Sequence, residues 1–447
     1  MNVDLRRAAG ARVLLCRATT GYRGFMLIRD AVHGDVELDA LQARVLDFPT
    51  VQRLRGIKQL GTAYLVYPGA LHTRFDHSLG TCAVAQRFLR VLQRRHAECV
   101  TSELASFVGI AALLHDVTHV PFGHTFEDER RLFPRHDKGE RLSLLLKGPL
   151  GESLHRLGIA EVVEEILGAR PRRTVPEWAA QVVSSTIDAD LLDYLRRDAY
   201  FTGLAPRYDE RVFQSFAIAD NQLALALTRH GMLRPDAFSE TVQLLRLRYF
   251  LTERVYYHHT KVAAGAMISK AVELAQQYGT LGETELLELQ DAPLLERLRK
   301  IPSANDPDPR LVGLVQRLER RELFKRGYVI SAATLTRTQR AALVRRYHES
   351  AEERRRAEEA IARELRCDAS EVIVYCPALT VMKEAKASVV TPDGLVPLDQ
   401  YDRSGEIAAL QRRYEELWRF YVFVPEPFRT AAAAISAEYF GYPSEHH

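Results

Sequence analysis

The sequence predicts a mainly α-helical protein that carries a small α/β module at its C-terminal end. Between residues 37 and 318, apolar residues recur mostly at three- and four-residue spacing, which is the period of an amphipathic helix. After the turn-rich segment SANDPDP at 303–309, short runs rich in β-branched and aromatic residues replace that pattern. Hydrophobic residues at 47% and charged residues at 27% of the 447 positions are typical of a globular protein.

Helices are expected wherever the apolar period is continuous in the first part of the chain. These segments are residues 37–48, 51–60, 81–96, 103–115, 178–199, 238–261 and 262–278. Proline cannot continue a helix and glycine weakens one. The expected breaks therefore fall at Pro49, Gly61, Pro68 with Gly69, and the turn at 121–123.

The C-terminal module is expected to begin with a charged helix at 350–365. Opposite charges at helical spacing there predict a solvent-exposed face. Strands at 371–375 and 420–424 and a last helix at 427–440 complete the module. We predict three parts: a flexible, arginine-rich tail at 1–25, a helical core at 26–305 and the α/β module at 306–447, for which subunit contact or regulation is a guess from position.

Composition excludes several classes of protein. The longest apolar runs are far shorter than the roughly 18 residues of a membrane span, so no membrane partner is expected. A formal charge of +3 does not by itself support nucleic-acid binding. Five cysteines without a CxxC pair indicate free thiols in a reducing compartment, and we expect a cytoplasmic protein.

Three short segments concentrate side chains capable of chemistry: LHTRFDHSLG at 71–80, LLHDVTHVPFGH at 113–124 and IDADLLDYLRRDAYFTG at 187–203. In the second, His115 and Asp116 are adjacent at the end of an apolar helix. Imidazole and carboxylate together suit a divalent transition metal better than Ca²⁺. A lone His–Asp pair is a weak signal. His77, which opens a helix, is a candidate third ligand, and Asp190 is a candidate fourth.

These segments carry a family resemblance. The run DFPTVQRLRGIKQLGTAYLVYPGALHTRFDHSLG, followed by HDVTHVPFGH and DADLLDYLRRDAYFTG, resembles the HD-domain superfamily. Within it, the chain is most similar to the deoxynucleoside triphosphate triphosphohydrolases typified by the sterile-alpha-motif-and-HD-domain protein. The resemblance covers about residues 26–300 and implies an HD-domain helical core. We expect no sterile-alpha-motif domain ahead of it.

The resemblance implies a metal centre and catalytic residues. Its ligands are His77, His115, Asp116 and Asp190, and the ion is divalent: iron, manganese, magnesium, nickel or zinc. The implied catalytic residues are His119, His124, Glu127 and His136. The family has aspartate where this chain has Glu127, which can still orient an imidazole. An alternative for His136 is an ordinary loop histidine in solvent.

The resemblance also implies substrate contacts. Gln59 and Asp198 would hold the sugar 3′-hydroxyl, Tyr194 and Tyr256 would crowd the 2′ position, and Arg74 and Arg248 would bind phosphates. The alternative for Arg248 and Tyr256 is a surface arginine and a core tyrosine. Two positions depart from the family: Leu191 replaces a phosphate-binding lysine and Thr252 replaces a histidine. Both departures leave room for a substrate with fewer phosphates or for a phosphodiester.

Regulation by a guanine nucleotide is a further implication. Asp47, Gln52 and Arg55 match positions of an allosteric site between subunits, whereas Met26 and Arg29 do not match its nucleotide contacts. The alternative is that 47–55 is simply a structural helix pair. The resemblance implies a homo-oligomer, either a dimer or a tetramer.

The leading interpretation is therefore a metal-dependent dNTP triphosphohydrolase that releases deoxynucleoside and inorganic triphosphate. The alternative is another HD phosphohydrolase, either a nucleotidase or a nuclease or phosphodiesterase acting on single-stranded nucleic acid. The same metal and histidines would serve both. A non-catalytic module that keeps the fold for oligomerisation is a third possibility, against which the complete ligand set argues.

Overall fold

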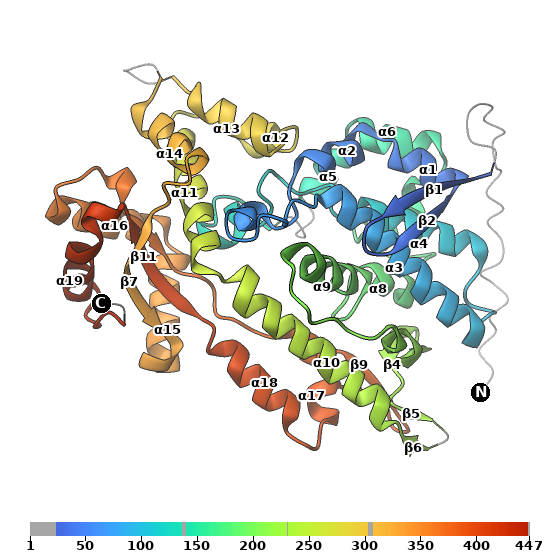
Figure 1. Cartoon of the computed structure of the whole chain (residues 1–447). Coiled ribbons are helices and arrows are strands. Elements are labelled where there is room, and N and C mark those ends of the chain that lie inside the picture. The colour runs from blue at the N-terminus through green and yellow to red at the C-terminus, as the bar shows by residue number, and fades with distance from the viewer. Residues whose placement is uncertain (1–23, 136–139, 230, 303–306, 446–447) are drawn as a thin grey trace.

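A computed structural model describes residues 24–135, 140–229, 231–302 and 307–445. The predicted fold class is confirmed, because helices dominate the chain and the sheets are small (Figure 1). None of the helices within the described residues is long and apolar enough to cross a membrane. The tail predicted at 1–25 lies almost wholly outside the described residues.

The centre of the molecule is α3 (Arg74–Arg95), which packs against both α4 (Ser102–Leu114) and α9 (Ala189–Thr202). Thr73 and Asp76 form a capping box that starts α3, and the Asp188 side chain accepts from the Leu191 amide to start α9. Such caps satisfy the free amides of a first turn. Helix α3 therefore begins seven residues before the predicted start at 81, and its first turn enters the site.

Other predicted boundaries are corrected. The segment 37–48 is not one helix, because its first residues complete a hairpin of β1 (Phe25–Asp30) and β2 (Gly34–Asp39) before α1 (Ala40–Leu46) starts at the Asp39 cap. The segment 51–60 is only a turn of α2 (Pro49–Gln52) followed by a 3₁₀ turn. The segment 178–199 is two helices, α8 (Glu177–Val183) and α9. Asp188 separates them, since a side chain that caps a new helix requires extended backbone.

The last two core helices break earlier than predicted. Helix α10 (Pro235–Leu251) runs into a π-helical turn at Thr252–Tyr256, and α11 (His259–Gln276) follows. The remaining helices of this part surround the centre: α5 (Glu140–Leu146), α6 (Pro149–Arg156), α7 (Ala160–Ile166), α12 (Glu283–Leu286), α13 (Asp291–Arg299) and α14 (Pro309–Glu319). Two short strands, β5 (Thr228–Arg229) and β6 (Met232–Leu233), pair beside α10.

The C-terminal elements form an antiparallel sheet in the order β7–β11–β8, from β7 (Lys325–Ser331), β11 (Arg419–Val424) and β8 (Ile373–Tyr375). Three helices accompany it: α15 (Arg337–Leu343), α16 (Ala351–Leu365) and α19 (Arg429–Phe440). The strands and helices predicted after residue 350 are confirmed to within two residues at each end. Alternation and charge pattern were strong enough to identify them.

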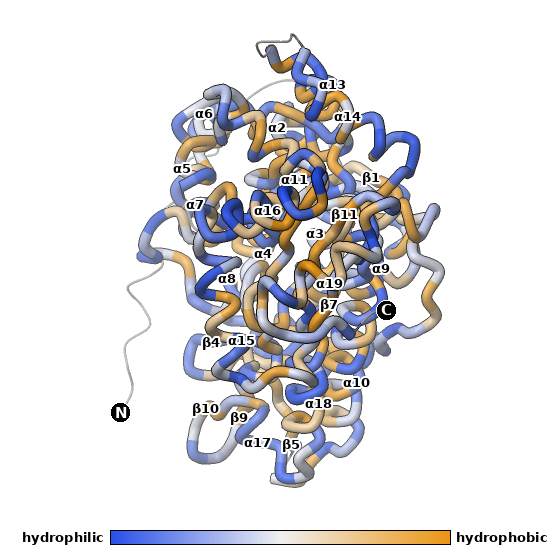
Figure 2. Tube along the Cα trace, turned by 90° about the vertical axis from the view of Figure 1, so that its left-hand side faces the viewer, coloured by the Kyte–Doolittle hydropathy of each residue, from blue (hydrophilic) through white to orange (hydrophobic). Residues whose placement is uncertain are grey.

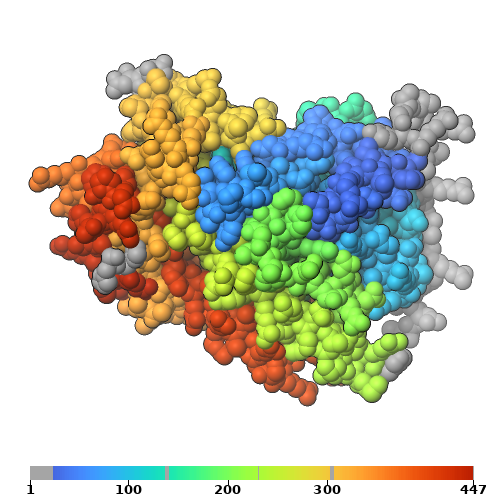
Figure 3. All heavy atoms as spheres, in the orientation of Figure 1, coloured from blue at the N-terminus to red at the C-terminus, as the bar shows by residue number. Residues whose placement is uncertain are grey.

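The C-terminal chain also returns to the core. Strands β9 (Ser388–Thr391) and β10 (Gly394–Pro397) extend a sheet with β4 (Gln222–Leu225) and β3 (Phe216–Ala219), in the order β10–β9–β4–β3. Helix α17 (Leu398–Tyr401) follows, and α18 (Glu406–Glu415) packs against α10. In Figure 3 the orange-red C-terminal surface reaches along the lower edge to the yellow-green residues of α10. The division at 305/306 remains a prediction.

Three apolar clusters form the interior, one around α3 and α4, one around α11 and one around the C-terminal sheet. In Figure 2 many of the hydrophobic stretches lie in the interior of the molecule, and many hydrophilic ones lie at its periphery. Burial of these apolar faces, at roughly 25 cal/mol per Å², is the main force that holds the elements together.

The charged helix α16 has the predicted solvent-exposed face, which carries Glu352 and Arg356, but two of its charged residues are buried. Glu358 is fully buried and accepts from Arg130 Nη1 at 2.7 Å and from Lys270 Nζ at 2.6 Å. Arg354, also buried, donates to the Arg130 carbonyl at 2.9 Å. Arg130 directly follows the turn that carries two of the candidate catalytic residues. The network therefore joins that turn to α16.

Removal of Glu358 should destabilise the protein strongly. Breaking a buried charge pair by deleting one partner costs about 3–5 kcal/mol, so Glu358→Ala should lower the free energy of unfolding in urea by about that amount. Glu352→Ala is the matched control on the same helix, because Glu352 and its partner Arg356 are both exposed, and it should change stability little. Equal stability of Glu358→Ala and wild type would contradict the role of the network.

The same carboxylate predicts sensitivity to acid. Burial raises the pKa of Glu358, but the charges of Arg130 and Lys270 outweigh burial and lower the pKa to about 2. A carboxyl whose folded pKa lies below its unfolded value of about 4.3 adds stability above that value and loses it as the pH falls. Between about pH 4 and pH 2, the free energy of unfolding should therefore fall more steeply in wild type than in Glu358→Gln.

Candidate active site

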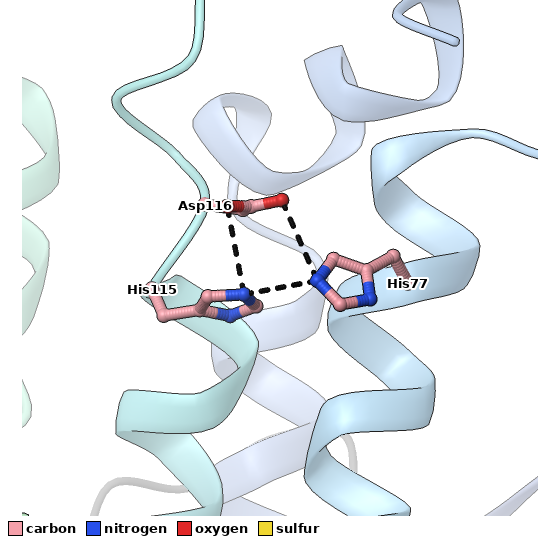
Figure 4. Close-up of side chains that lie close together, drawn as sticks. All are labelled: His77, His115 and Asp116. Atoms are coloured by element: carbon pink, nitrogen blue, oxygen red, sulfur yellow. Dashed lines mark hydrogen bonds and ion pairs between the residues drawn. The ribbon is translucent and has the colours of Figure 1, made fainter. Parts of the chain in front are cut away.

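Three side chains converge where α3 and the end of α4 meet (Figure 4). His77 lies in the first turn of α3, His115 ends α4, and Asp116 follows where the chain turns away. The two Nε2 atoms of the histidines are 3.2 Å apart. Asp116 places Oδ1 3.5 Å from His115 Nε2 and Oδ2 3.8 Å from His77 Nε2. The three donor atoms lie within 4.8 Å of one another and could hold a metal ion.

Asp190, in the first turn of α9, faces the same point. Its Oδ1 is 3.0 Å from His77 Nε2 and 3.8 Å from His115 Nε2. Its side chain is 39% exposed, so it stands at the open side of the group. All four predicted ligands are thus together. Two imidazole nitrogens and two carboxylates suit a divalent first-row transition metal such as Mn²⁺ or Fe²⁺, and the residues present fit such an ion.

Each histidine is oriented from behind. His77 Nδ1 donates to Asp193 Oδ2 at 2.7 Å, and His115 Nδ1 donates to the Ala112 carbonyl at 2.7 Å. These bonds fix the tautomer and leave both Nε2 atoms for a metal. Asp193 is itself held by Arg197 Nε at 2.8 Å and by His33 Nε2 at 2.5 Å. This role of Asp193 was not predicted from the sequence, although its three-residue spacing from Asp190 on one helix was a usable signal.

The group carries an excess of negative charge. Burial lowers the pKa of His77, but hydrogen bonds to Asp190 and Asp193 outweigh burial and raise the pKa to about 10. For Asp116, burial raises the pKa, but the nearby Arg74 charge and the surrounding histidines hold it well below its usual value. The carboxylates around His77 therefore favour a positive charge at this point, and a bound divalent cation would supply one.

The candidate catalytic histidines lie beside this group. His119 Nε2 is 3.1 Å from Asp116 Oδ1, and the His119 and His124 rings meet edge to face at 4.8 Å. His124 Nδ1 is 3.4 Å from Glu127 Oε2 across a π-helical turn, and Arg141 Nη1 donates to the other Glu127 oxygen at 2.5 Å. His124 is the accessible member, with 44% of its side chain exposed. His136 lies outside the described residues.

Gly123 lets this turn form. Its φ is +63°, and a Cβ there would lie 2.7 Å from Arg74 Nη2. Only glycine combines that conformation with so close an approach. Arg74 Nη1 in turn donates to Asp116 Oδ2 at 2.6 Å, so this predicted phosphate ligand is bound to a candidate metal ligand.

The predicted sugar contacts form a second cluster. Asp198 accepts from Tyr256 Oη at 2.7 Å and binds His72 Nε2 at 2.8 Å. The Tyr194 and Tyr256 rings meet edge to face at 6.3 Å. The sequence analysis missed His72, which orients Asp198 from the buried side. Gln59 contributes a buried side-chain oxygen that has no hydrogen-bond partner among the described residues.

A single cavity of about 1240 Å³ joins both clusters. Its walls include the four candidate metal ligands and His124, together with Tyr194, Tyr256 and Arg248. Leu191 and Thr252, the two departures from the family, also line it. Residues 377–381, 383 and 384 of the C-terminal region contribute as well, whereas the sequence analysis placed no active-site residue beyond Tyr256.

The predicted allosteric residues lie apart from this cavity lining. Gln52 Nε2 donates to the Leu46 carbonyl at 2.8 Å, and Arg55 Nε donates to Gln52 Oε1 at 2.8 Å. The Arg55 guanidinium also lies 3.5 Å from the centre of the Phe75 ring. These contacts are those expected of the structural alternative. The allosteric role of Asp47, Gln52 and Arg55 stays a prediction.

Comparison with known proteins decides the family. Residues 74–198 match the HD domain, and residues 209–447 match the HD associated region. The chain belongs to the HD-domain family. The predicted resemblance is confirmed, and the range that matches the HD domain contains all four predicted metal ligands. Residues 209–447 match as one region that spans both the end of the predicted core and the C-terminal module.

Individual proteins are also similar to this HD protein in sequence or in fold. An uncharacterised protein of Methanocaldococcus jannaschii is 31% identical over 311 residues, which are 67% of this chain and 58% of the relative. The human deoxynucleoside triphosphate triphosphohydrolase SAMHD1 is 31% identical over 288 residues, covering 56% and 45% of the two chains. The chain spans about half the length of the curated relatives it matches. A phosphohydrolase crystal structure from Bacteroides thetaiotaomicron shares the fold, with a TM-score of 0.68, 24% identity, and coverage of 90% and 100%.

Loss of a ligand should remove the metal. We expect His115→Ala and Asp190→Ala to purify with little divalent metal by elemental analysis. Asp193→Asn should keep the ligands but weaken metal affinity about 10–100-fold, as is typical when the partner of a ligating histidine is changed. Asp198→Asn is the matched control on α9, because Asp198 binds His72 and Tyr256, and it should retain full metal. Full occupancy in His115→Ala and Asp190→Ala would refute the site.

Proposed function

We propose that this HD protein is a metal-dependent dNTP triphosphohydrolase that cleaves a deoxynucleoside triphosphate into deoxynucleoside and inorganic triphosphate. The observation that carries the proposal is the Tyr194–Tyr256–Asp198 cluster, which opens into the same cavity as the His–Asp group. Similarity to SAMHD1, whose name states this activity, supports it.

The reaction needs water to attack the α-phosphorus while the bond from that phosphorus to the 5′-oxygen breaks. A divalent ion at His77, His115, Asp116 and Asp190 would polarise a phosphoryl oxygen and lower the pKa of water. His124 is suited to deliver a proton to the departing 5′-oxygen, because its ring is exposed to the cavity and Glu127 lies behind it. Imidazole can exchange protons near neutral pH.

The cluster around Asp198 is suited to select the sugar. Asp198 can accept a hydrogen bond from a 3′-hydroxyl, and its orientation is set by His72 and Tyr256. The two tyrosine rings form a wall that a 2′-hydroxyl would have to displace. The unpartnered oxygen of Gln59 offers a further acceptor. This arrangement favours deoxyribose over ribose.

The second candidate is another HD phosphohydrolase, acting on a nucleotide with fewer phosphates or on a phosphodiester. Leu191 and Thr252 favour it, since neither can bind phosphate by charge. The side chain of Arg248 is also engaged, with its Nε 3.4 Å from Glu384 Oε1. A nuclease would use the same metal group and His124.

Substrate and product analysis should separate the two candidates. Purified protein is incubated with each dNTP, each NTP, 2′,3′-dideoxy analogues and a labelled oligonucleotide under several divalent metals, and products are followed by phosphorus NMR. We expect intact triphosphate from dNTPs and at least about tenfold slower turnover of NTPs and dideoxy analogues, the size of one lost buried hydrogen bond.

Tyr256→Phe and Tyr256→Ala sharpen this test. The phenylalanine variant keeps the ring and should still discriminate against ribose, whereas the alanine variant should lose discrimination. Equal rates on GTP and dGTP in wild type would contradict the sugar pocket. Orthophosphate or pyrophosphate as the first product, or activity confined to oligonucleotides, would support the second candidate.

A further inference from the structure

The C-terminal segment between β8 and β9 forms one wall of the active-site cavity. It contains Leu379, Thr380 and Lys383, all of which line the cavity together with Asp188 and Leu191 of the α9 start. This wall comes from a part of the chain that lies about 180 residues after the end of α9 in sequence. A substrate in the cavity would therefore contact both the HD domain and the C-terminal region.

The segment is held firmly in place. Trp418 Nε1 donates to the Pro377 carbonyl at 3.0 Å, and Met382 and Ala385 are buried in the main apolar cluster. Glu384 is 1% exposed and lies 3.4 Å from Arg248 Nε. Arg248 in turn stands 5.2 Å from the centres of both the Tyr194 and Tyr256 rings. The backbone that carries Lys383 is thus fixed relative to the sugar cluster.

Lys383 itself is exposed to the cavity and makes no hydrogen bond or ion pair with any other described residue. Its neighbour Lys386, in the same 3₁₀ turn (Lys383–Lys386), behaves differently and binds Asp399 at 2.6 Å.

Three other cations of this cavity are paired with carboxylates: Arg74 with Asp116, Arg248 with Glu384 and Arg135 with Asp128. Arg131 and Lys261 also line the cavity, but they belong to the loop after the π-helical turn and to α11. A phosphate chain that starts at the candidate metal ligands and runs along the α9 wall would meet Leu191, which has no charge. The positive charge that binds it would therefore have to come from another element. Lys383 is placed to supply it.

We propose that Lys383 binds the phosphates beyond the reacting one, so that the C-terminal region supplies the positive charge of a polyphosphate site along the α9 wall, where Leu191 carries none. The inference rests on the proposed function for its substrate. It makes a separate claim, however, because binding of a polyphosphate at Lys383 can be measured without any hydrolysis.

Binding of inorganic triphosphate to the metal-loaded full chain, measured by isothermal titration calorimetry, tests the proposal. Lys383→Ala should weaken binding about tenfold, the size expected for one charge-assisted hydrogen bond, and Lys383→Arg should largely retain it. Lys386→Ala is the matched control in the same turn and should bind as wild type does. Leu191→Lys in the Lys383→Ala background should recover part of the loss, because Leu191 lines the same cavity.

The outcomes separate this inference from the proposed function. Equal triphosphate affinity of Lys383→Ala and wild type overturns the role of Lys383, whether or not dNTPs are hydrolysed, and so does equal weakening in Lys386→Ala. No triphosphate binding by wild type overturns it also. Selective loss in Lys383→Ala, in a wild-type protein that fails to hydrolyse dNTPs, upholds the polyphosphate site and refutes the proposed reaction.

Discussion

The active site depends on the contact between α3 and α9, where the buried Asp193 carboxylate binds His77 and Arg197. Gly80, one turn after His77 on α3, makes this contact possible, since a Cβ there would lie only 2.0 Å from Asp193 Oδ1. The carboxylate orients the imidazole from behind, and the imidazole then faces His115, Asp116 and Asp190. If the two helices moved apart, the histidine would lose its orientation and the candidate ligand group would open.

Buried charge is used in the same way elsewhere in the molecule. Two buried networks are present: Asp193, Arg197 and Asp30 lie beside the candidate metal ligands, and Arg130, Glu358 and Lys270 lie beside the turn that follows His124. An unpaired charge in either place would be costly. Each network therefore favours one arrangement of its elements. The first joins the β1–β2 hairpin to α9, and the second joins the turn after His124 to α16.

The cavity combines parts that are distant in sequence. Helices α3, α4 and α9 supply the metal group, α10 with its π-helical turn supplies Arg248 and Tyr256, and the segment before β9 supplies Lys383 and Glu384. The pairing of β9 with β4 brings this last segment to the core. The C-terminal region thus lines the same cavity as the candidate metal ligands, in addition to packing against the HD domain.

The sequence by itself determined the fold class, most of the long helices and the HD family, because apolar period and contiguous motifs are local signals. It also identified the four candidate metal ligands His77, His115, Asp116 and Asp190, because residue type and the order of the motifs are visible in the sequence itself. It could not find the β1–β2 hairpin or the break between α8 and α9, where capping by Asp39 and Asp188 overrides helical period.

Only the tertiary structure decided which charges are buried and which segments share a cavity. The charge pattern of the helix that contains Glu358 predicts exposure to solvent, yet Glu358 is buried and paired with Arg130 and Lys270. Both partners are more than 80 residues away in sequence. Asp193, His72 and Lys383 acquire their positions in the same manner, from contacts between helices and strands that no local pattern encodes. The physical reason is that periodicity reports which face of an element is apolar, whereas pairing of polar groups depends on which other element that face meets.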